Sequence, residues 1–378
     1  MFDFFDNANN LIGPVEMETV RGIVTNIVFV ALAFAFAFFM SYIITPLIKK
    51  LATRVGAIDV PEDDRRMHKR PIPRLGGIAI FIAFLLGVLI FVTFTGDNKA
   101  YIYMLIASFL IVGMGIVDDI RNLNAWIKLA VQIVAALIVV MNGVVIETMF
   151  GYELGNWAYP ITMIWIVGIT NAINLIDGLD GLACGVSTIS AVALLIVAVL
   201  VPGPDMTTII VTAVLIGSCS GFLPYNVYPA KIFMGDVGSM LLGFVLSVIS
   251  VEGSFKASFV APLLVLGFPI LDTLMAVFRR IRKKQSVFQA DRKHFHHRLI
   301  DMGLNHKQSV SLLWGVSALL GIAAILLTVG EPLPAAIIMI VSLAVGLVNW
   351  FVMKGESNTE GNGCQPNMST EEEKDKKT

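Results

Sequence analysis

Long apolar segments recur along almost the whole chain and limit the folds that it can adopt. A helix needs about 20 mostly apolar residues to cross a bilayer, and only helices or closed β-barrels satisfy every backbone hydrogen-bonding group in lipid. Segments this rich in Leu, Ile, Val, Ala and Phe favour helices. The sequence therefore predicts an all-α polytopic membrane protein with about eleven transmembrane helices. We expect them near residues 23–48, 76–95, 100–118, 125–142, 158–176, 181–201, 206–223, 237–252, 258–279, 309–329 and 332–352.

The composition agrees with a membrane location. The 378 residues are 56% hydrophobic and 15% charged, whereas soluble domains are about 25% charged. The formal net charge of -1 does not indicate a strongly charged partner, and we expect no nucleic-acid binding. Cys184, Cys219 and Cys364 have no CxxC spacing, so the cysteines predict neither a zinc site nor a disulfide framework.

The basic residues predict how the helices are oriented. Cytoplasmic loops of membrane proteins carry an excess of Lys and Arg. With the N-terminus outside, all of the 27 Lys and Arg residues except Arg21, Lys99 and Lys256 fall on the cytoplasmic side. We therefore expect an outer N-terminus, a cytoplasmic C-terminus and a location in the cell membrane.

Two segments outside the predicted spans have their own signatures. Residues 355–378 have almost no apolar content, which predicts a disordered cytoplasmic tail after a single transmembrane catalytic domain at 1–354. Residues 143–157 are long enough for a short external hairpin with Gly143, Gly151 and Gly155 as its turn residues.

Acidic residues follow two of the predicted spans. Adjacent carboxylates such as Asp118 and Asp119 repel each other unless a cation or a shared proton relieves them; Lys128 or a divalent metal would do so. After the fifth span, Asn171, Asn174, Asp177 and Asp180 recur every three residues, which places them on one face if the helix continues. Hard cations prefer such oxygens. The alternatives are a hydrated acidic pair and a loop with helix-capping side chains.

Three further clusters lie at the same predicted membrane face. Asp236 stands between glycines at the start of the eighth span, as a ligand residue near an anion-binding helix N-terminus or simply as its N-cap. Residues 291–298 (DRKHFHHR) combine histidines with Arg and Lys, which suit a metal or a pyrophosphate. The segment 65–77 (RRMHKRPIPRLGG) either holds the topology beside anionic lipid or binds substrate.

Four motifs give the chain a recognisable pattern: Asp118-Asp119, NAINLIDGLDGLA at 171–183, FMGDVGSMLLG at 233–243 and HFHHRL at 294–299. With them the chain resembles the polyprenyl-phosphate N-acetylhexosamine-1-phosphate transferases, over about residues 40–330. The forms HFHHRL and PRLGG resemble the N-acetylglucosamine branch that initiates teichoic acid (cell wall) and O-antigen (lipopolysaccharide) synthesis. Asn122 stands where a third acid would complete a DDxxD pattern, so an isoprenyl-diphosphate mechanism is not implied.

The resemblance implies a reaction and a set of residue roles. A polyprenyl phosphate, undecaprenyl phosphate in the reaction that we expect, attacks UDP-N-acetylglucosamine and gives undecaprenyl-diphospho-N-acetylglucosamine and UMP. Mg²⁺, with Mn²⁺ as an alternative ion, is the implied cofactor. The implied roles are metal binding for Asn174 and Asp236; catalysis for Asp118, Asp119, Asp177, Asp180 and Asp236; and substrate binding for Lys128, Asn171, Asn226, Phe233, His294, His296, His297 and Arg298.

Three alternatives remain open from the sequence. The first is a phospho-N-acetylmuramoyl-pentapeptide transferase of the same family, although its usual TPTMGG-like segment is absent. The second is a polytopic transporter or flippase, which should show paired polar residues near the bilayer midplane; Asp272 is the main charged residue inside a predicted span. The third is a catalytically silent scaffold, which would not need these residues. A homodimer is also compatible with the sequence.

Overall fold

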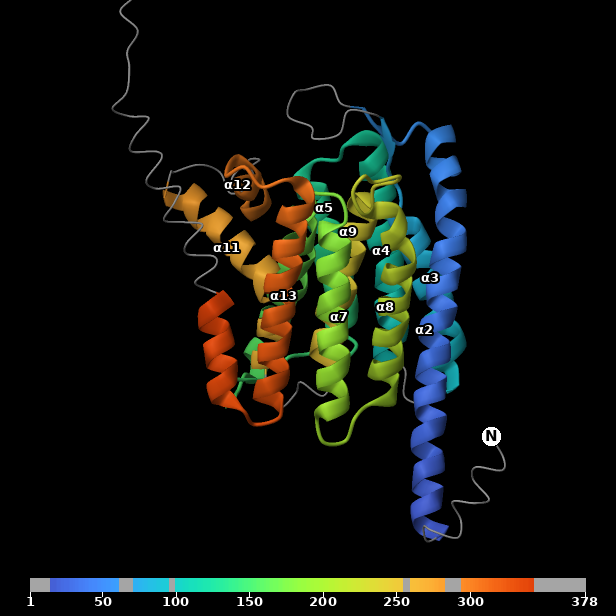
Figure 1. The fold of residues 1–378 in the computed structure, drawn as a ribbon, viewed down its shortest axis with the longest axis vertical. Helices are drawn as coiled ribbons and strands as arrows, with labels where there is room; N and C mark the ends of the chain where they lie inside the picture. Colours follow the sequence, from blue (N-terminus) through green and yellow to red (C-terminus); the bar gives the residue numbers. More distant parts are fainter. Residues whose placement is uncertain (1–13, 61–70, 95–98, 254–258, 283–293, 343–378) are drawn as a thin grey trace, which may run out of the picture.

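The computed structural model describes residues 14–60, 71–94, 99–253, 259–282 and 294–342, and most of these residues are helical (Figure 1). The predicted tail at 355–378 and the last part of the span at 332–352 lie outside them. The helices are α2 (Pro14–Arg54), α3 (Gly77–Phe91), α4 (Lys99–Arg121), α5 (Ala125–Val140), α6 (Ala158–Ile176), α7 (Leu182–Leu200), α8 (Met206–Asn226), α9 (Gly235–Glu252), α10 (Val260–Val265), α11 (Gly267–Arg282), α12 (Phe295–Asp301) and α13 (His306–Thr328), with short 3-10 turns at Val92–Phe94 and Gly155–Trp157.

Seven helices in the described part of the chain are long and apolar enough to cross a membrane. Gly77–Phe91, Ala125–Val140 and Pro332–Ser342 are apolar but shorter. The protein is therefore a polytopic, mostly helical membrane protein, as the sequence predicts. The total of eleven spans and the orientation of the termini stay predictions.

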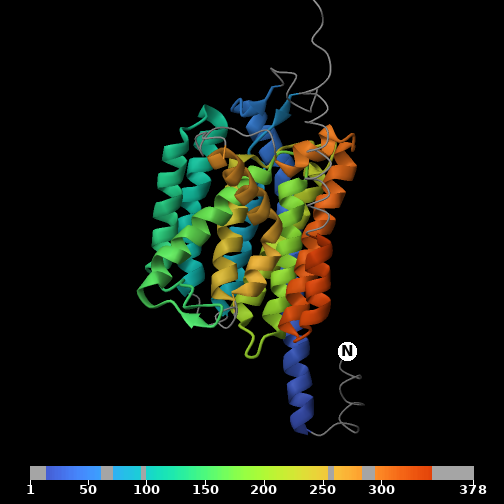
Figure 2. The ribbon, with the colours of Figure 1, turned by 90° about the vertical axis from the view of Figure 1, so that its left-hand side faces the viewer.

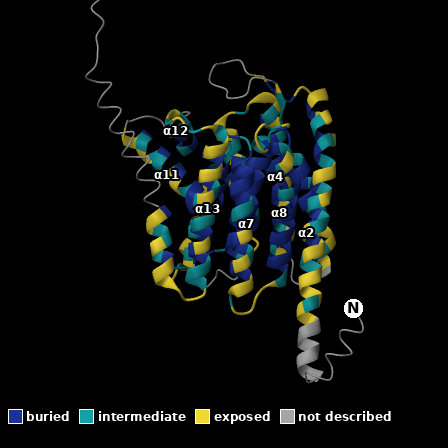
Figure 3. Ribbon diagram, in the orientation of Figure 1, coloured by how far each residue is buried: buried dark blue, intermediate teal, exposed yellow. Residues whose placement is uncertain are grey.

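Helices α8 and α9 form the centre of the bundle. Every residue of α9 from Val237 to Val251 is buried, and α9 packs against α3, α4 and α6. A helix that is apolar on all sides must be covered on all sides, and Figure 3 shows this buried centre between more exposed outer helices. α2 covers α8 and α3 and extends past the far end of the bundle (Figure 2).

The ninth predicted span, 258–279, is not one helix. The structure divides it at Leu266 into α10 and α11, and α11 is inclined away from the bundle (Figure 1). Pro269 has no N–H to donate to the carbonyl of Val265, so the regular helical ladder is interrupted there. The prediction of one continuous helix was wrong at this position.

Two short antiparallel ladders interrupt the helical fold. Ile58–Asp59 (β1) pairs with Ile72–Pro73 (β2), which the sequence did not predict. Thr148–Met149 (β3) pairs with Tyr152–Glu153 (β4) within the hairpin expected at 143–157, and its three glycines all adopt positive φ. The hairpin itself is confirmed.

Helices α2, α4, α6, α8 and α11 all end at one end of the bundle, here called the site end (Figure 1). α2 begins at the opposite end. Residues that are more than a hundred positions apart in sequence meet at the site end because successive helices run up and down.

Candidate active site

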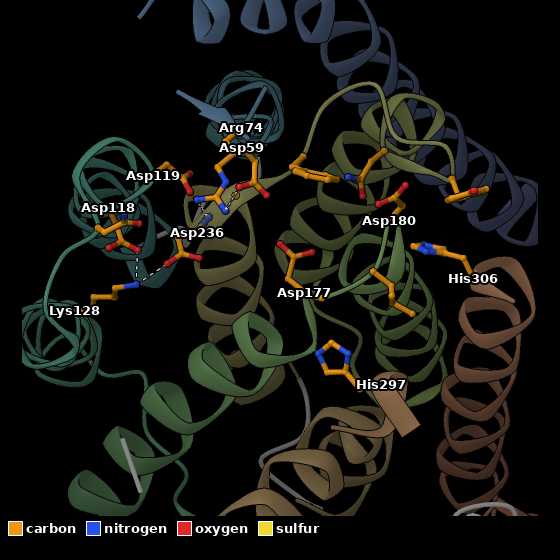
Figure 4. Close-up of a pocket in the computed structure, with 17 residues that line it drawn as sticks. Asp59, Arg74, Asp118, Asp119, Lys128, Asp177, Asp180, Asp236, His297 and His306 are labelled. Atoms are coloured by element: carbon orange, nitrogen blue, oxygen red, sulfur yellow. Dashed lines mark hydrogen bonds and ion pairs between the residues drawn. The ribbon is translucent and has the colours of Figure 1, made fainter. Parts of the chain in front are cut away.

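A cavity of about 430 Å³ opens at the site end. Its wall is built from the ends of helices and the segments that join them, and it is mainly polar (Figure 4). The residues that line it are Asp59, Arg74, Asp118, Asp119, Asn122, Lys128, Asp177, Gly178, Leu179, Asp180, Asn226, Tyr228, Phe233, Gly235, Asp236, His297 and His306.

Lys128 joins two carboxylates across the cavity wall. Its Nζ contacts the carboxylate of Asp118 and lies 2.8 Å from Oδ2 of Asp236. Asp118 is buried at the end of α4, where its Oδ1 accepts the backbone N–H of Leu123 at 2.6 Å. Asn124 caps α5, so Lys128 projects from the first turn of that helix. The cation that the sequence required for the acidic pair is therefore Lys128, but it bridges Asp118 to Asp236.

Asp119 has a different partner from its neighbour. Its carboxylate accepts the backbone N–H groups of Asp236 at 3.0 Å and Val237 at 3.4 Å, which are free donors at the N-terminus of α9. Gly235 allows this contact because its φ is +72° and a Cβ there would lie 2.2 Å from Oδ2 of Asp119. Asp119 thus fixes the start of α9, the helix that carries Asp236.

The polar stripe predicted at 171–180 divides into two parts. α6 ends at Ile176, so Asn171 and Asn174 lie on the helix, whereas Asp177 and Asp180 follow in the turn that Gly181 closes with φ +76°. The single four-residue helical face was therefore a wrong prediction. The turn nevertheless brings Asp177 and Asp180 to the cavity.

The two asparagines of this stripe have protein partners. Asn174 donates to Oδ1 of Asp236 at 3.0 Å and to Ser239 Oγ at 2.8 Å, so it lies behind a residue of the cavity wall without lining the cavity itself. Asn171 exchanges hydrogen bonds with Gln132 and does not line the cavity. Its predicted contact with substrate stays a prediction that this geometry does not favour.

Asp177 and Asp180 differ in their surroundings. Burial, and then the carboxylates of Asp236 and Asp119, raise the pKa of Asp177 to about 8. Asp180 accepts the backbone N–H of Ala230 at 2.9 Å and so ties the α6–α7 turn to the α8–α9 connection. Asp177 therefore holds a proton more readily than a solvated carboxyl group, first because it is buried and then because other carboxylates lie near it.

Of the four residues in the histidine motif that were predicted to bind substrate, only one lines the cavity. His297 lines the cavity, whereas His294, His296 and Arg298 are buried behind it. His294 Nδ1 lies 2.8 Å from Asp272 Oδ2, and the N–H of Phe295 donates to the same carboxylate.

His296 is packed tightly against the α6–α7 turn. A Cβ on Gly178 would meet its Nε2 at 2.2 Å. Burial, and then the neighbouring His297, lower the pKa of His296 to about 3. This histidine is therefore a neutral packing group in the structure, and its predicted contact with substrate stays untested.

Asn226 and Phe233 line the cavity beside residues that sequence reasoning did not single out. Asn226 donates to the carbonyl of Ile232 at 3.2 Å. The rings of Tyr228 and His306 stack with centroids 4.6 Å apart. The newly found wall residues are Asp59, Arg74, Tyr228 and His306. The PRLGG motif pointed to the segment of Arg74; an isolated acid such as Asp59 gave no signal.

The donor set of the cavity fits a hard divalent cation. The carboxylate oxygens of Asp236 and Asp177 on the wall, and the amide oxygen of Asn174 next to Asp236, are of the type that Mg²⁺ prefers. No group of three acidic, histidine or cysteine side chains in the described residues is arranged to hold an ion by itself. Mg²⁺ usually takes one or two carboxylates and completes its shell with water and substrate phosphates, so this arrangement suits it.

The fold and cavity thus define a polytopic membrane protein with an acidic, lysine-bridged site at one end of its helices. Residues 101–254 match glycosyl transferase family 4. A second match, to the C-terminal part of the protein export membrane proteins SecD/SecF, covers residues 233–355. The second match covers a smaller part of the chain and begins inside the FMGDVGS motif, which already belongs to the first.

Curated relatives agree with the first match. The chain is 41% identical, over 79% of its length and 85% of the relative's, to the probable undecaprenyl-phosphate N-acetylglucosaminyl 1-phosphate transferase of Bacillus subtilis. It is 35% identical, over 73% and 78%, to the decaprenyl-phosphate N-acetylglucosaminephosphotransferase of Mycobacterium leprae. A Thermotoga maritima undecaprenyl-phosphate alpha-N-acetylglucosaminyl 1-phosphate transferase is 34% identical over 68% and 78%. The chain therefore belongs to the polyprenyl-phosphate N-acetylhexosamine-1-phosphate transferases of glycosyl transferase family 4, and it is an enzyme.

Proposed function

We propose that the protein transfers N-acetylglucosamine-1-phosphate from UDP-N-acetylglucosamine to undecaprenyl phosphate on the cytoplasmic face of the membrane. The products are undecaprenyl-diphospho-N-acetylglucosamine and UMP. The names of the relatives in Bacillus subtilis and Thermotoga maritima support the sugar and the carrier. The observation that carries the proposal is the bridge from Lys128 to Asp118 and Asp236, because it joins three helices around one polar cavity.

The reaction brings two anions together. An oxygen of the lipid phosphate attacks the sugar-linked β-phosphorus of the nucleotide, the new P–O bond forms, and the bond to the bridging oxygen breaks to release UMP. Phosphoryl transfer depends mainly on positioning and on charge neutralisation. The acceptor monoester has a second pKa of about 6 and is mostly dianionic at neutral pH, so it needs little help from a base.

The cavity residues divide this task. Lys128 contacts both Asp118 and Asp236, where it offers positive charge to an incoming phosphate and offsets the repulsion between the two carboxylates. Asp236 and Asn174 would hold Mg²⁺, which supplies charge neutralisation on the diphosphate and on the leaving UMP. Asp119 holds the first turn of α9 and thereby the position of Asp236. Asp118 is the candidate base if the acceptor is protonated.

The remaining polar residues line the rest of the cavity. Asn226 and Phe233 lie on the wall formed by the α8–α9 connection, and we assign them to the uracil. His297 lies on the α12 side, where it would contact the sugar phosphate. Asp177 and Asp180 also line the cavity (Figure 4), and we assign them to ordering the nucleotide.

An apolar cavity of about 420 Å³ supports a lipid acceptor. It lies between α6, α10 and α11, and its wall includes Ile164, Trp165, Phe259 and Leu274. The lining runs along α6 as far as Ala172, two residues before Asn174. A polyprenyl chain in this cavity would leave its phosphate at the site end, beside the polar cavity.

The experiment that tests the reaction uses purified protein in detergent with Mg²⁺ and undecaprenyl phosphate. UDP-N-acetylglucosamine, UDP-N-acetylgalactosamine and UDP-N-acetylmuramoyl-pentapeptide are offered separately, and UMP and the lipid product are measured. We expect both products with UDP-N-acetylglucosamine and neither without lipid. Asp236→Ala and Asp118→Asn should abolish UMP release. Near-normal turnover from both variants would refute the site, and lipid product from the pentapeptide donor alone would refute the assignment of the sugar.

The cytoplasmic location rests on the distribution of basic residues. Arg121 is exposed at the site end, and Gly203 is exposed in the turn between α7 and α8 at the opposite end. In a variant without native cysteines, a membrane-impermeant thiol reagent added to intact cells should label Gly203→Cys and spare Arg121→Cys. The reverse labelling would overturn the orientation.

A further inference from the structure

Arg74 lies on the wall of the polar cavity, directly after β2. Its guanidinium points into the cavity near Asp119 and Asp59 (Figure 4). Nη2 lies 3.3 Å from Oδ1 of Asp59, and the two side chains are 31% and 11% exposed. Arg74 is therefore a half-buried cation that reaches the cavity, whereas the sequence left open whether its segment holds the topology or binds substrate.

The backbone around Arg74 is fixed to the segment that carries Asp236. The N–H of Phe233 donates to the carbonyl of Pro73 at 2.8 Å, and Gly76 and Gly77 donate to the carbonyls of Phe233 and Met234 at 2.9 and 2.8 Å. The N–H of Arg74 itself donates to Ala57 at 2.9 Å. The backbone on either side of Arg74 is thus hydrogen-bonded both to the segment before β1 and to the start of α9.

The backbones of α3 and α9 approach each other closely next to Arg74, which leaves this segment little room to move. A Cβ on Gly77 would lie 2.1 Å from the backbone nitrogen of Gly238, so the backbones of α3 and α9 touch at the first turn of each. Because both segments are held in register, the position of the guanidinium relative to Asp236 is set by backbone contacts. An arginine that only held the topology would not require a backbone fixed in this way.

The charges of the cavity give Arg74 a task. The described wall carries six aspartates, and its lysine and arginine residues are Lys128 and Arg74. Lys128 already contacts two carboxylates, whereas the contact of Arg74 with Asp59 involves one terminal nitrogen. A guanidinium has five N–H donors in a planar fork that matches phosphate oxygens. Both proposed substrates carry phosphate.

We propose that Arg74 binds a substrate phosphate with its outer N–H groups, while Asp59 holds the other side of the guanidinium in position. This inference rests on the proposed function for the identity of the ligand, which is either the diphosphate of the nucleotide sugar or the phosphate of the lipid carrier. Asp59 is a positioning residue, since it acts through Arg74.

The test compares Arg74→Ala, Arg74→Lys, Asp59→Asn and the double variant Arg74→Ala/Asp59→Asn. The matched control is Arg121→Ala, an exposed arginine at the site end that does not line the cavity. For each, KM is measured separately for UDP-N-acetylglucosamine and for undecaprenyl phosphate, and UDP binding is measured by calorimetry. Size-exclusion profiles and unfolding temperatures identify any variant that fails to fold, and such a variant is replaced by Arg74→Gln.

Loss of a charge-assisted hydrogen-bonding group corresponds to about a 10- to 100-fold loss of affinity. We expect Arg74→Ala to raise one KM by this factor, Arg74→Lys to recover part of it because the charge remains, and Arg121→Ala to behave as wild type. The double variant should be no worse than Arg74→Ala. A change in the nucleotide KM with weaker UDP binding identifies the diphosphate, and a change in the lipid KM alone identifies the carrier phosphate.

Unchanged KM values and unchanged UDP binding in a folded Arg74→Ala protein would overturn the inference and leave Arg74–Asp59 as a structural ion pair. The failure of the proposed function would look different. The wild-type protein would then release no UMP from any donor, while a loss of UDP binding in Arg74→Ala would still support the phosphate contact.

Discussion

Gly235 offers the sharpest test of how the site is built, through the substitution Gly235→Ala. An L-residue in the left-handed region costs about 1–2 kcal/mol, and the φ of Gly235 is +72°. The new Cβ would also lie 2.2 Å from Oδ2 of Asp119. Either the carboxylate or the first turn of α9 must move.

The second contribution comes from the hydrogen bonds that this movement breaks. Asp119 accepts from Asp236 at 3.0 Å and from Val237 at 3.4 Å, and a hydrogen bond to a charged group contributes about 1.5–3 kcal/mol. If the shorter bond is counted in full and the longer one as weak, the substitution lowers the free energy of unfolding by about 3–5 kcal/mol in total. Asp236 moves with the helix start, away from Lys128 and Asn174.

A displacement of about 1 Å at a reacting centre costs about 100-fold in rate, so Gly235→Ala should lower UMP release by at least this factor and also lower the unfolding temperature. The control is Gly113→Ala, because Gly113 lies within α4 and a Cβ there meets nothing within 4 Å. Near-normal turnover from Gly235→Ala would refute the argument that Asp119 and Gly235 together set the position of Asp236.

Three other predictions address charge and protonation. Asp118→Asn should lose far more activity than Asp119→Asn. An asparagine at 119 keeps an oxygen that can cap α9, whereas an asparagine at 118 removes the charge that pairs with Lys128. Equal losses of UMP release in the two variants would contradict this. Chelation of the metal should abolish turnover. Because the pKa of the buried carboxyl group of Asp177 is about 8, the apparent Mg²⁺ affinity should rise from about pH 6.5 to 8.5 as this group ionises. The substitution Asp177→Asn should flatten this pH profile. The pKa of His296 is lowered from 6.5 to about 3, so its contribution to stability is complete above pH 6.5 and is lost as the pH falls toward 3. Over this range the unfolding temperature of His296→Gln should therefore fall less steeply than that of the wild type. An unchanged slope would contradict the assignment of His296 as a neutral packing group.

The sequence predicts the helices well for a physical reason. In lipid each helix must be long and apolar, so length and composition are sufficient to find most of them. They are not sufficient to distinguish a bent helix from a broken one, because neighbouring helices can satisfy the groups that a proline frees. The break before Pro269 depends on such packing, and a window of apolar residues does not contain that information.

The site was predicted unevenly for a related reason. Asp118, Asp177, Asp180 and Asp236 were found because acidic residues at the ends of apolar segments are conspicuous, and the structure brings them to one cavity. Lys128 was expected beside the acidic pair, but its second partner, Asp236, was not predictable. The same holds for Asp119, which caps a helix that begins 116 positions further along the chain, at Gly235. For the histidine motif, residue type suggested four ligands, but the local helix turns only His297 toward the cavity.

The excess of aspartates explains why a site of this kind would need a cation before it could react. Six carboxylates surround two fixed cations among the described wall residues, and Asp177 relieves part of the repulsion by holding a proton. A nucleotide diphosphate and a lipid phosphate would add further negative charge to the same space. Since like charges a few ångströms apart repel by several kcal/mol in a partly desolvated site, neither substrate would enter on the strength of Lys128 and Arg74 alone. A divalent ion at Asp236 and Asn174 would offset both problems at once, because it pairs with the carboxylates and with the phosphates. In this view the acidic wall provides selectivity for phosphates that arrive with a metal, and the two basic residues determine where those phosphates come to rest.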